Sequence, residues 1–460
     1  MVSKLESVSK SMMVKPSSPT PNHLRHFKIS LLDEMAPSVY IPIILFYSAT
    51  DISSSPFGTH DFKAMSNKLK ASLSKVLTLY YPFCGRFKCT SSSSSISVDC
   101  NDEGVPYIES KFSKNLSDIL NRPQSEMQEL LPFHPYNHDV PNISEHCDKH
   151  MVSMAVKVSE FKCGGVALGV CLSHKIADGE TTASFLNAWA KTARDLFNEV
   201  EPPQMDASLI FPSRGIEWAL NSLMVGEGGG NEKLVTKCFL FSAMDLSRLR
   251  VRFGSFNATR VEAVTTLIWK SAIQAAKASS GDDESKRTLK ASLVCHALNI
   301  RNRMVPPLPK NMFGNLWLFA FSDLVETDGT YGTEELHDLV EIVRNGIREA
   351  AANYSSLINQ GDDGVNELVE FSKEAKLMVT ENIIACYGFS SWIRFGFYDV
   401  DFGWGRPTKV KNINLPMKNI IYLIPTRNGD GIETWVTMTE LDMDEFQRNP
   451  GLLQFASLES

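Results

Sequence analysis

Residues 154–179 read MAVKVSEFKCGGVALGVCLSHKIADG, and this stretch decides the fold of the N-terminal half. Two short apolar runs, 154–161 and 166–172, are joined by Cys-Gly-Gly, a pattern that predicts a β-hairpin. The second strand would present His174 at its end, ahead of a tight polar turn that reaches Asp178. Rigid strand ends of this kind are places where folds commonly present catalytic side chains.

Other periodic segments surround this hairpin. Apolar residues recur at three- and four-residue spacing over 65–80 and over 186–197, which predicts two amphipathic helices. An extended apolar run at 40–47 is typical of a buried strand. Strands and helices mix without regular β-α-β alternation, so we predict an α/β protein with mixed sheets.

The length of the chain indicates more than one domain. A chain of 460 residues exceeds what one hydrophobic core usually organises. The region 206–236 contains PSRG and GEGGGNE, which are typical of a linker. We therefore predict an N-terminal domain over 1–205, a crossover linker over 206–236 and a C-terminal domain over 237–460.

The C-terminal half combines predicted helices with predicted strands. Thr259-Arg260-Val261-Glu262 has the pattern of a capping box and predicts the start of a helix. A long amphipathic helix is expected from 334 to about 352. Strand-like runs lie at 293–300, 316–321, 419–424 and 432–438.

Composition narrows the classes of function. The net charge is −7 and the Lys and Arg residues are scattered, so we expect no nucleic-acid partner. No uncharged apolar run is long enough to span a bilayer, and residues 1–15 lack the apolar core of a signal peptide. A mitochondrial presequence is a weaker alternative, because residues 1–15 contain a single acidic residue but no Arg. The nine cysteines form no C-x-x-C pair, which favours reduced thiols in a cytoplasmic protein over a disulfide framework or a metal site.

His174 and Asp178 lie four residues apart in the string CLSHKIADG. An imidazole exchanges protons near neutral pH and suits a general base. The local string leaves a structural interpretation open, in which Asp178 caps the following helix and His174 is a hydrogen-bonded residue at the edge of the core.

A second string, DFGWGRP at 401–407, combines two glycines and two aromatic rings. Such a string needs special backbone angles or close packing. It contains no reactive nucleophile or base with a partner, so a structural loop that locks one domain to the other is the favoured interpretation.

In their order and wide separation, these strings resemble the paired H-x-x-x-D and D-F-G-W-G signatures of the BAHD acyltransferases. Further matches lie at Lys15–Pro21 (K-P-x-x-P-T-P), Leu31–Asp33 (L-x-L-L-D), Tyr81–Arg86 (Y-P-x-A-G-R, with Cys84 in place of Ala) and 299–315. Within the family, the strings SHKIAD, SVDCND and SSW are similar to the branch that includes vinorine synthase and salutaridinol acetyltransferase.

The resemblance implies two chloramphenicol-acetyltransferase-like domains with an active-site tunnel at their interface. It implies that His174 is the general base of a transfer without a covalent acyl-enzyme, and that Asp178 pairs with Arg301 to support the loop. Ser390 and Trp392 would contribute to the oxyanion site or pocket. Implied contacts with CoA are Arg260, Arg301, Arg303, Lys310, Asp401 and Gly403.

The expected reaction is the transfer of an acyl group, most simply acetyl from acetyl-CoA, to the hydroxyl of a plant specialised metabolite such as an alkaloid or terpenoid. Acyl-CoA is a co-substrate, no bound cofactor or metal is expected, and the protein is expected to be a monomer. Three alternatives stay open: acyl transfer to an amine, transfer of a longer or aromatic acyl group, and a non-catalytic protein that binds small molecules.

Overall fold

The computed structural model describes residues 7–54, 61–89, 96–120, 122, 124–136, 151–215, 233–280, 291–326, 336–380, 384–413 and 416–459. The chain divides into two compact units. Unit 1 comprises 1–219, 309–315 and 395–413, and unit 2 comprises 220–308, 316–394 and 414–460. Each unit thus contains segments far apart in the sequence, whereas the predicted domains were continuous. Residues 216–232 of the predicted linker lie outside the described residues.

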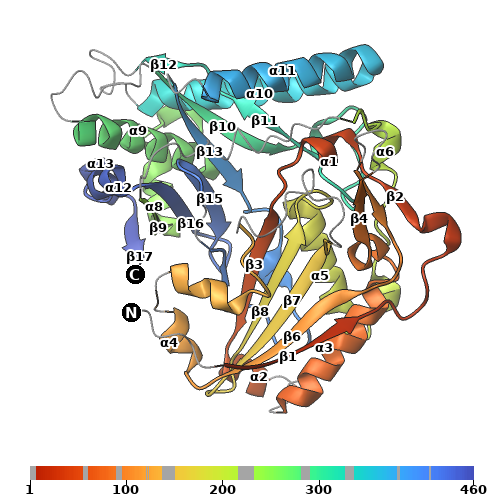
Figure 1. Ribbon diagram of the computed structural model, residues 1–460. Helices are drawn as coiled ribbons and strands as arrows, with labels where there is room; N and C mark the ends of the chain where they lie inside the picture. The colour runs from red at the N-terminus through yellow and green to blue at the C-terminus, as the bar shows by residue number, and fades with distance from the viewer. Residues whose placement is uncertain are drawn as a thin grey trace. The chain divides into compact units, whose positions relative to one another are not determined.

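Unit 1 is built on a six-stranded sheet in the order β1-β6-β7-β8-β3-β14. Figure 1 shows β1, β6, β7, β8 and β3 side by side. The strands are β1 Ser7–Val14, β3 Tyr40–Tyr47, β6 Val105–Phe112, β7 Met154–Phe161, β8 Val166–Ser173 and β14 Lys409–Lys411. β6 and β7 are parallel and the other pairs are antiparallel, so the sheet is mixed as predicted. β7 and β8 form the predicted hairpin, and every residue of β3 and β8 is buried. The end of β8 is therefore a rigid position.

Two helices of unit 1 are held together by a buried indole. α3 (Phe62–Val76) and α5 (Gly179–Ala193) are in contact, and Trp189 of α5 donates its Nε1–H to the main-chain oxygen of Leu69 and to Ser72 Oγ of α3, both at 3.1 Å. Among its described residues, unit 1 also contains the helices α1 Leu31–Met35, α2 Ala49–Ser54, α4 Leu116–Leu120 and α6 Ala207–Ile210, and a small sheet of β2 His26–Lys28, β5 Ile96–Asp99 and β4 Arg86–Cys89. Since α5 begins directly after Asp178, its anchoring also fixes the turn that follows β8.

The DFGWG string packs into unit 1. β14 pairs with β3, which adds a strand from the C-terminal half to the sheet. The Phe402 ring lies 5.0 Å from that of Trp189, and the Trp404 ring lies 6.1 Å from that of Tyr47. Buried aromatic area of this kind is a large contribution to a core. This packing is the physical reason why residues 395–413 separate from the rest of the C-terminal half.

Unit 2 is built on an eight-stranded mixed sheet, in the order β11-β10-β13-β15-β16-β9-β17 with β12 paired to β10. β10, β13 and β15 are parallel to one another, and the other pairs are antiparallel. The strands are β9 Leu234–Phe241, β10 Ala291–Asn299, β11 Trp317–Phe321, β12 Val325–Glu326, β13 Ile384–Ser391, β15 Ile420–Pro425, β16 Ile432–Thr439 and β17 Ser457–Glu459. The four strands predicted for this half are confirmed as β10, β11, β15 and β16.

Helices pack on the sheet of unit 2 and on one another. They are α8 Ala243–Val251, α9 Arg260–Ser280, α10 Leu336–Asn359, α11 Asp362–Thr380, α12 Glu440–Phe446 and α13 Pro450–Leu453. α10 and α11 lie side by side (Figure 1). The predicted capping box is present, because Thr259 N–H donates to Glu262 Oε2 at 2.8 Å and Glu262 N–H donates to Thr259 Oγ1 at 3.2 Å. Within the described residues, no helix combines the length and the hydropathy needed to cross a membrane.

Candidate active site

His174 directly follows β8, and its backbone N–H donates to the main-chain oxygen of Val39 at 2.8 Å. The ring Nδ1 lies 3.0 Å from Oδ1 of Asn315. Burial lowers the pKa of His174 below its ordinary 6.5, and the neighbouring ammonium of Lys175 acts in the same direction. The attraction of Asp178 and the hydrogen bonds of the ring oppose this shift without cancelling it. The imidazole is therefore neutral at neutral pH, as a general base must be.

The contacts of the Asn315 amide assign the histidine tautomer. Nδ2 of Asn315 donates to the main-chain oxygen of His174 at 2.6 Å and to Asp33 Oδ1 at 2.8 Å. Because an amide nitrogen only donates, Oδ1 must be the atom that faces the imidazole. Nδ1 of His174 then carries the proton, and the lone pair lies on Nε2. A ring in this state can accept a proton at Nε2 from a substrate hydroxyl.

Asp178 is the N-cap of α5. Its Oδ1 accepts the backbone N–H of Thr181 at 2.8 Å, and the side chain is buried. The capping interpretation raised by the sequence is thus confirmed. Arg301, the predicted partner of Asp178, begins a 3-10 turn of unit 2, where its backbone N–H donates to Asn299 Oδ1 at 3.1 Å. The two residues belong to different units, and their pairing stays a prediction.

Ser390 and Trp392 come together at the end of β13. Trp392 donates its Nε1–H to Ser390 Oγ at 3.2 Å, and its ring lies 5.0 Å from that of Tyr422 in an edge-to-face arrangement. A serine hydroxyl that accepts this bond still has its own proton to donate. The Ser390 hydroxyl can therefore donate a hydrogen bond, and the role of the pair at an oxyanion stays a prediction. Both residues belong to unit 2.

The predicted CoA residues lie in both units. Arg260 donates to the main-chain oxygens of Gly429 and Asp430, at 2.7 and 3.1 Å, and so holds the turn between β15 and β16. Arg303 donates to the main-chain oxygen of Asn299 at 2.7 Å. Lys310 lies in unit 1, with its Nζ 3.7 Å from Glu180 Oε1. Each of these cations thus has a local partner within its own unit.

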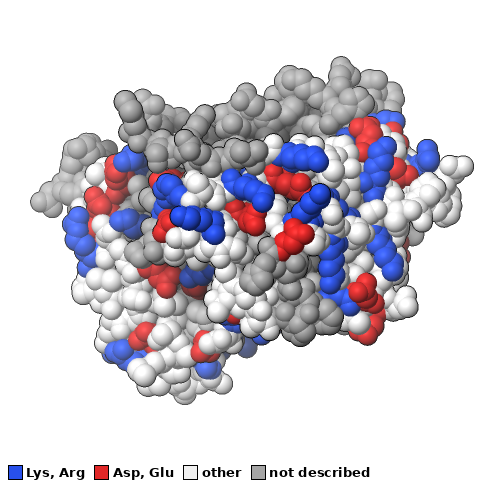
Figure 2. All heavy atoms as spheres, turned by 90° about the horizontal axis from the view of Figure 1, so that it is seen from below, with Lys and Arg blue, Asp and Glu red and all other residues white. Residues whose placement is uncertain are grey.

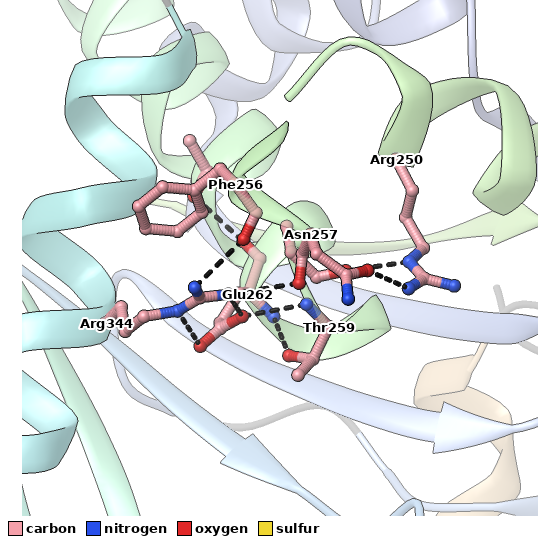
Figure 3. A network of polar contacts seen from close by, with 8 residues as sticks. Arg250, Phe256, Asn257, Thr259, Glu262 and Arg344 are labelled. Atoms are coloured by element: carbon pink, nitrogen blue, oxygen red, sulfur yellow. Dashed lines mark hydrogen bonds and ion pairs between the residues drawn. The ribbon is translucent and has the colours of Figure 1, made fainter. Parts of the chain in front are cut away.

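A network of polar contacts surrounds Glu262 near the start of α9 (Figure 3). Arg344 of α10 holds Glu262 with two hydrogen bonds, from Nε to Oε1 at 2.9 Å and from Nη2 to Oε2 at 2.7 Å. Arg344 also donates to the main-chain oxygen of Phe256 at 3.0 Å, and its guanidinium lies 3.9 Å from the Phe256 ring centre. This network ties α9 to α10.

Asp401 and Gly403 are engaged within their own loop. Asp401 Oδ1 accepts the backbone N–H groups of Gly403 and Gly405, at 2.7 and 2.9 Å. Both glycines have φ near 102°, a conformation that residues with a Cβ rarely adopt. These contacts favour the structural interpretation of the string over direct contact with CoA.

One group of described residues has the spacing of metal ligands. The thiol of Cys238 and carboxylate oxygens of Glu433 and Glu459 lie within 4.8 Å of one another, on β9, β16 and β17 of unit 2. Carboxylates and thiols also gather without a metal. Acyl transfer by a histidine base requires none, so we assign no metal site to this group.

Asn315 was missed as a site residue. It lies at the end of the matched segment 299–315, but an amide does not titrate and gave no chemical signal in the sequence. The turn 309–315 packs into unit 1, where Thr181 Oγ1 donates to the main-chain oxygen of Gly314 at 2.9 Å. Only the fold brings Asn315 next to His174.

Comparison with known proteins identifies the family of the chain. The profile of the Transferase family matches residues 4–453. Stemmadenine O-acetyltransferase of Catharanthus roseus is 37% identical over 443 residues, which are 94% of this chain and 93% of that protein. Vinorine synthase of Rauvolfia serpentina is 36% identical over 453 residues, 96% of each chain. Limonoid 21-O-acetyltransferase of Melia azedarach is 31% identical over 456 residues, 98% of each chain.

The fold agrees as well. A crystal structure of vinorine synthase superposes with a TM-score of 0.80 at 32% identity and covers 98% of both chains. The resemblance carried by the H-x-x-x-D and D-F-G-W-G strings is therefore confirmed over nearly the whole length of the chain. The chain belongs to the Transferase family, the BAHD acyltransferases, and is an acyl-CoA-dependent O-acyltransferase.

Proposed function

We propose that this acyltransferase moves an acetyl group from acetyl-CoA to the hydroxyl of an alkaloid or terpenoid, with His174 as the general base. The observation that carries the proposal is the hydrogen bond between Nδ1 of His174 and Oδ1 of Asn315, which leaves Nε2 as the proton acceptor. The names of the relatives support the substrate class, since they describe acetyl transfer to stemmadenine and to limonoids.

The reaction is balanced by one proton that moves twice. Nε2 of His174 takes the proton of the acceptor hydroxyl while the oxygen forms a bond to the thioester carbon. The tetrahedral oxyanion collapses and the C–S bond breaks. The CoA thiolate then takes the proton from Nε2 of His174. The products are an ester and free CoA. Ser390 Oγ–H and Trp392 are the proposed groups that face the oxyanion.

Further roles follow from the proposal. Asp178 pairs with Arg301 to hold the loop after His174, in addition to capping α5. Arg303 and Lys310 are the proposed contacts to the phosphates of CoA. Both are cations within the segment 301–315, where the family resemblance implies contacts with CoA. Arg260 acts by holding the turn at Gly429 that borders the start of α9.

We also infer a cytoplasmic monomer that does not bind nucleic acid. Cys84, Cys100 and Cys171 are buried free thiols, as expected of a protein in a reducing compartment. On the face drawn in Figure 2, described Lys and Arg side chains are interspersed with Asp and Glu. Cell fractionation tests the cytoplasmic location, and sedimentation velocity tests the monomeric state.

The proposed reaction is tested with purified protein, acetyl-CoA, a long-chain acyl-CoA and an aromatic acyl-CoA against panels of alcohols and amines. Release of free CoA thiol and product mass are measured together. Ester formation with acetyl-CoA is the expected result, whereas amide products or a preference for a larger acyl group would replace the proposed reaction.

The proposed base is tested with His174→Gln. We expect turnover to fall at least about a hundredfold, as for loss of a general base. His337→Gln on α10, where the side chain is exposed, is the matched control and should keep full turnover. Turnover of His174→Gln close to that of the wild type would show that another group removes the proton.

A further inference from the structure

Asp33 is a fully buried carboxylate whose two oxygens face different partners. Oδ2 accepts the backbone N–H of Ser30 at 2.8 Å and the Ser30 hydroxyl at 2.7 Å. Together with the bond from Asp33 N–H to Ser30 Oγ, at 3.1 Å, this is the capping box of α1. The hydrogen bonds at the start of α1 thus use Oδ2, whereas Oδ1 is not part of the capping box.

Oδ1 of Asp33 accepts both N–H groups of Asn315. The backbone nitrogen lies at 2.7 Å and the amide Nδ2 at 2.8 Å. The approach is close enough that a Cβ on Gly314 would lie 3.3 Å from the same oxygen, and Gly314 has a φ of +116°. The turn that carries Asn315 is therefore shaped around this carboxylate.

We infer that Asp33 is a positioning residue for catalysis: its carboxylate fixes the amide of Asn315, which in turn fixes the tautomer and the ring orientation of His174. This inference rests on the proposed role of His174 as the base. An ionised carboxylate only accepts hydrogen bonds, so the donor end of the Asn315 amide must face Asp33. The acceptor end then faces Nδ1 of the imidazole.

Because this network is buried, reversing the direction of its hydrogen bonds costs free energy. Asp33 and Asn315 are both buried, so an unsatisfied donor or acceptor in either residue has no water to replace its partner. Burial raises the pKa of the Asp33 carboxyl, and the hydrogen bonds from Ser30 and Asn315 oppose that shift without cancelling it. The backbone N–H groups of Ser30 and Asn315 can only donate, so each of the two oxygens must accept a hydrogen bond.

The Asp33→Asn substitution replaces one of the two acceptor oxygens of Asp33 by an NH2 group, which only donates. The carbonyl of the new amide would face the donors of Ser30, so its NH2 group would point toward the N–H groups of Asn315. The clash between the two side chains is relieved when the Asn315 amide turns over, which presents Nδ2 to Nδ1 of His174 and gives up the hydrogen bond from Nδ2 to the main-chain oxygen of His174. The imidazole would then carry its proton on Nε2, the atom that must accept the substrate proton.

The matched control is Asp245→Asn in unit 2. Asp245 is the third residue of α8, as Asp33 is of α1, and Ser242 Oγ donates to Asp245 Oδ2 at 2.6 Å while Asp245 N–H donates to Ser242 Oγ at 3.1 Å. Its other oxygen faces Arg248 at the surface. This substitution changes the cap of a helix and leaves the network of His174 intact.

The experiment measures kcat, the KM for acetyl-CoA and the 15N chemical shifts of histidine-labelled protein. The signals of His174 are those missing from the His174→Gln variant. For Asp33→Asn we expect a fall in kcat of about a hundredfold, a KM for acetyl-CoA within twofold of the wild type, and a His174 ring protonated on Nε2. Asp245→Asn should keep the wild-type kcat and the Nδ1–H tautomer.

A second variant covers the case in which Asp33→Asn does not fold. In the exchange Asp33→Asn with Asn315→Asp, the new amide at position 33 donates to the new carboxylate, which accepts Nδ1–H of His174 directly but has no donor for the main-chain oxygen of His174. We expect the Nδ1–H tautomer in this double variant.

The outcomes separate this inference from the proposed function. A folded Asp33→Asn with the wild-type tautomer and a kcat within threefold of the wild type would overturn the role of Asp33, as would an Nε2–H tautomer in the exchange variant. The turnover of His174→Gln tests the proposed role of His174 as the base independently of Asp33.

Discussion

Asn315 holds His174 at two points, since its Nδ2 donates to the main-chain oxygen of His174 at 2.6 Å while its Oδ1 lies 3.0 Å from the ring Nδ1. One amide thus restrains both the backbone and the imidazole of the proposed base. The arrangement replaces the carboxylate that orients histidine in Ser-His-Asp enzymes by a neutral acceptor. A neutral acceptor fixes the tautomer and raises the pKa of the ring less than a carboxylate would.

Asn315→Ala removes this acceptor. We expect kcat to fall by one to two orders of magnitude, because Nδ1–H loses its partner and the two tautomers then compete. Steady-state turnover and thermal unfolding are measured together. Asn311→Ala is the control on the same turn, where the amide donates to the main-chain oxygen of Pro202 at 2.8 Å, and it should leave kcat unchanged. Equal turnover of the two variants would contradict the positioning role of Asn315.

We expect Lys175 to set part of the pH dependence of turnover. This lysine is buried, its Nζ donates to the main-chain oxygen of Glu34 at 2.8 Å, and burial lowers its pKa to about 8. Its ammonium lowers the pKa of His174, whereas Asp178 raises it. Since the base must be neutral, a lower pKa extends activity to lower pH.

Lys175→Met should therefore raise the pKa of His174 and move the acid limb of kcat/KM to higher pH, by up to about one unit. The profile is measured from pH 5 to 8. Lys63→Met on α3, where the side chain is exposed, is the control for loss of a positive charge. An acid limb that stays in place, or moves to lower pH, would show that Lys175 does not act on the base.

The sequence predicted the strands that carry His174 better than the side chains that contact it. The hairpin at 154–172 and the buried strand at 40–47 were predictable, because their alternation of turn residues and apolar runs reflects local chemistry. The position of His174 at the end of β8 followed from these elements.

The neighbours of His174 were harder to predict, because they depend on contacts between distant segments. Asn315 is 141 residues away from His174 in the sequence. The segments 309–315 and 395–413 join unit 1 through packing against α5 and β3, and periodicity does not reveal such partners. The two continuous domains expected from the linker composition missed both segments for this reason.

His296 links stability to pH. It lies on β10 with its ring 5.3 Å from that of Phe389, and burial lowers its pKa to about 4. The unfolded chain takes up a proton near pH 6.5, whereas the folded protein does not until about pH 4. Stability contributed by the neutral ring is therefore present above pH 6.5 and is lost as the pH falls toward 4.

Between pH 8 and pH 5 this linkage amounts to about 2 kcal/mol. His296→Asn should remove that part of the pH dependence of the free energy of unfolding, measured with urea at both pH values, even if it lowers stability overall. His337→Asn on α10 is the control. If His296→Asn keeps the wild-type difference between the two pH values, the acid sensitivity has another source.

Asp178 has an observed role as a cap and a proposed role in an ion pair. Loss of the cap in Asp178→Ala should cost about 1 kcal/mol, since Thr181 N–H loses its acceptor. The proposed pairing with Arg301 adds about 3 to 5 kcal/mol, because a buried charge would lose its partner. Asp61→Ala removes the cap of α3, where Oδ1 accepts Lys63 N–H at 2.9 Å, and gives the cost of a cap alone.

Asp178→Asn separates the two roles, because an asparagine keeps the cap but not the charge. If the ion pair forms, Asp178→Asn should be nearly as unstable as Asp178→Ala in urea unfolding at pH 7. Full stability of Asp178→Asn would leave capping as the role of this residue and would remove Arg301 from the site.

Asp401 is expected to stabilise the protein without a part in proton transfer. Its Oδ1 accepts two backbone N–H groups in a loop where Gly403 and Gly405 have positive φ, and the loop packs Phe402 and Trp404 into unit 1. In Asp401→Ala both N–H groups lose their acceptor, which should cost about 1 to 3 kcal/mol. Asp399→Ala is the matched control, because that carboxylate forms an exposed pair with Arg406 and should contribute well under 1 kcal/mol.

Turnover per folded molecule at saturating acyl-CoA decides whether this role is structural. If the loop acts only through packing, Asp401→Ala should keep kcat within about threefold of the wild type, with a lower melting temperature or a raised KM for acyl-CoA. The His174→Gln variant, measured in parallel, gives the level of turnover without the base. A folded Asp401→Ala that is saturated with acyl-CoA and still falls to that level would mean that the loop takes part in the chemistry, since loss of packing alone does not remove a proton acceptor.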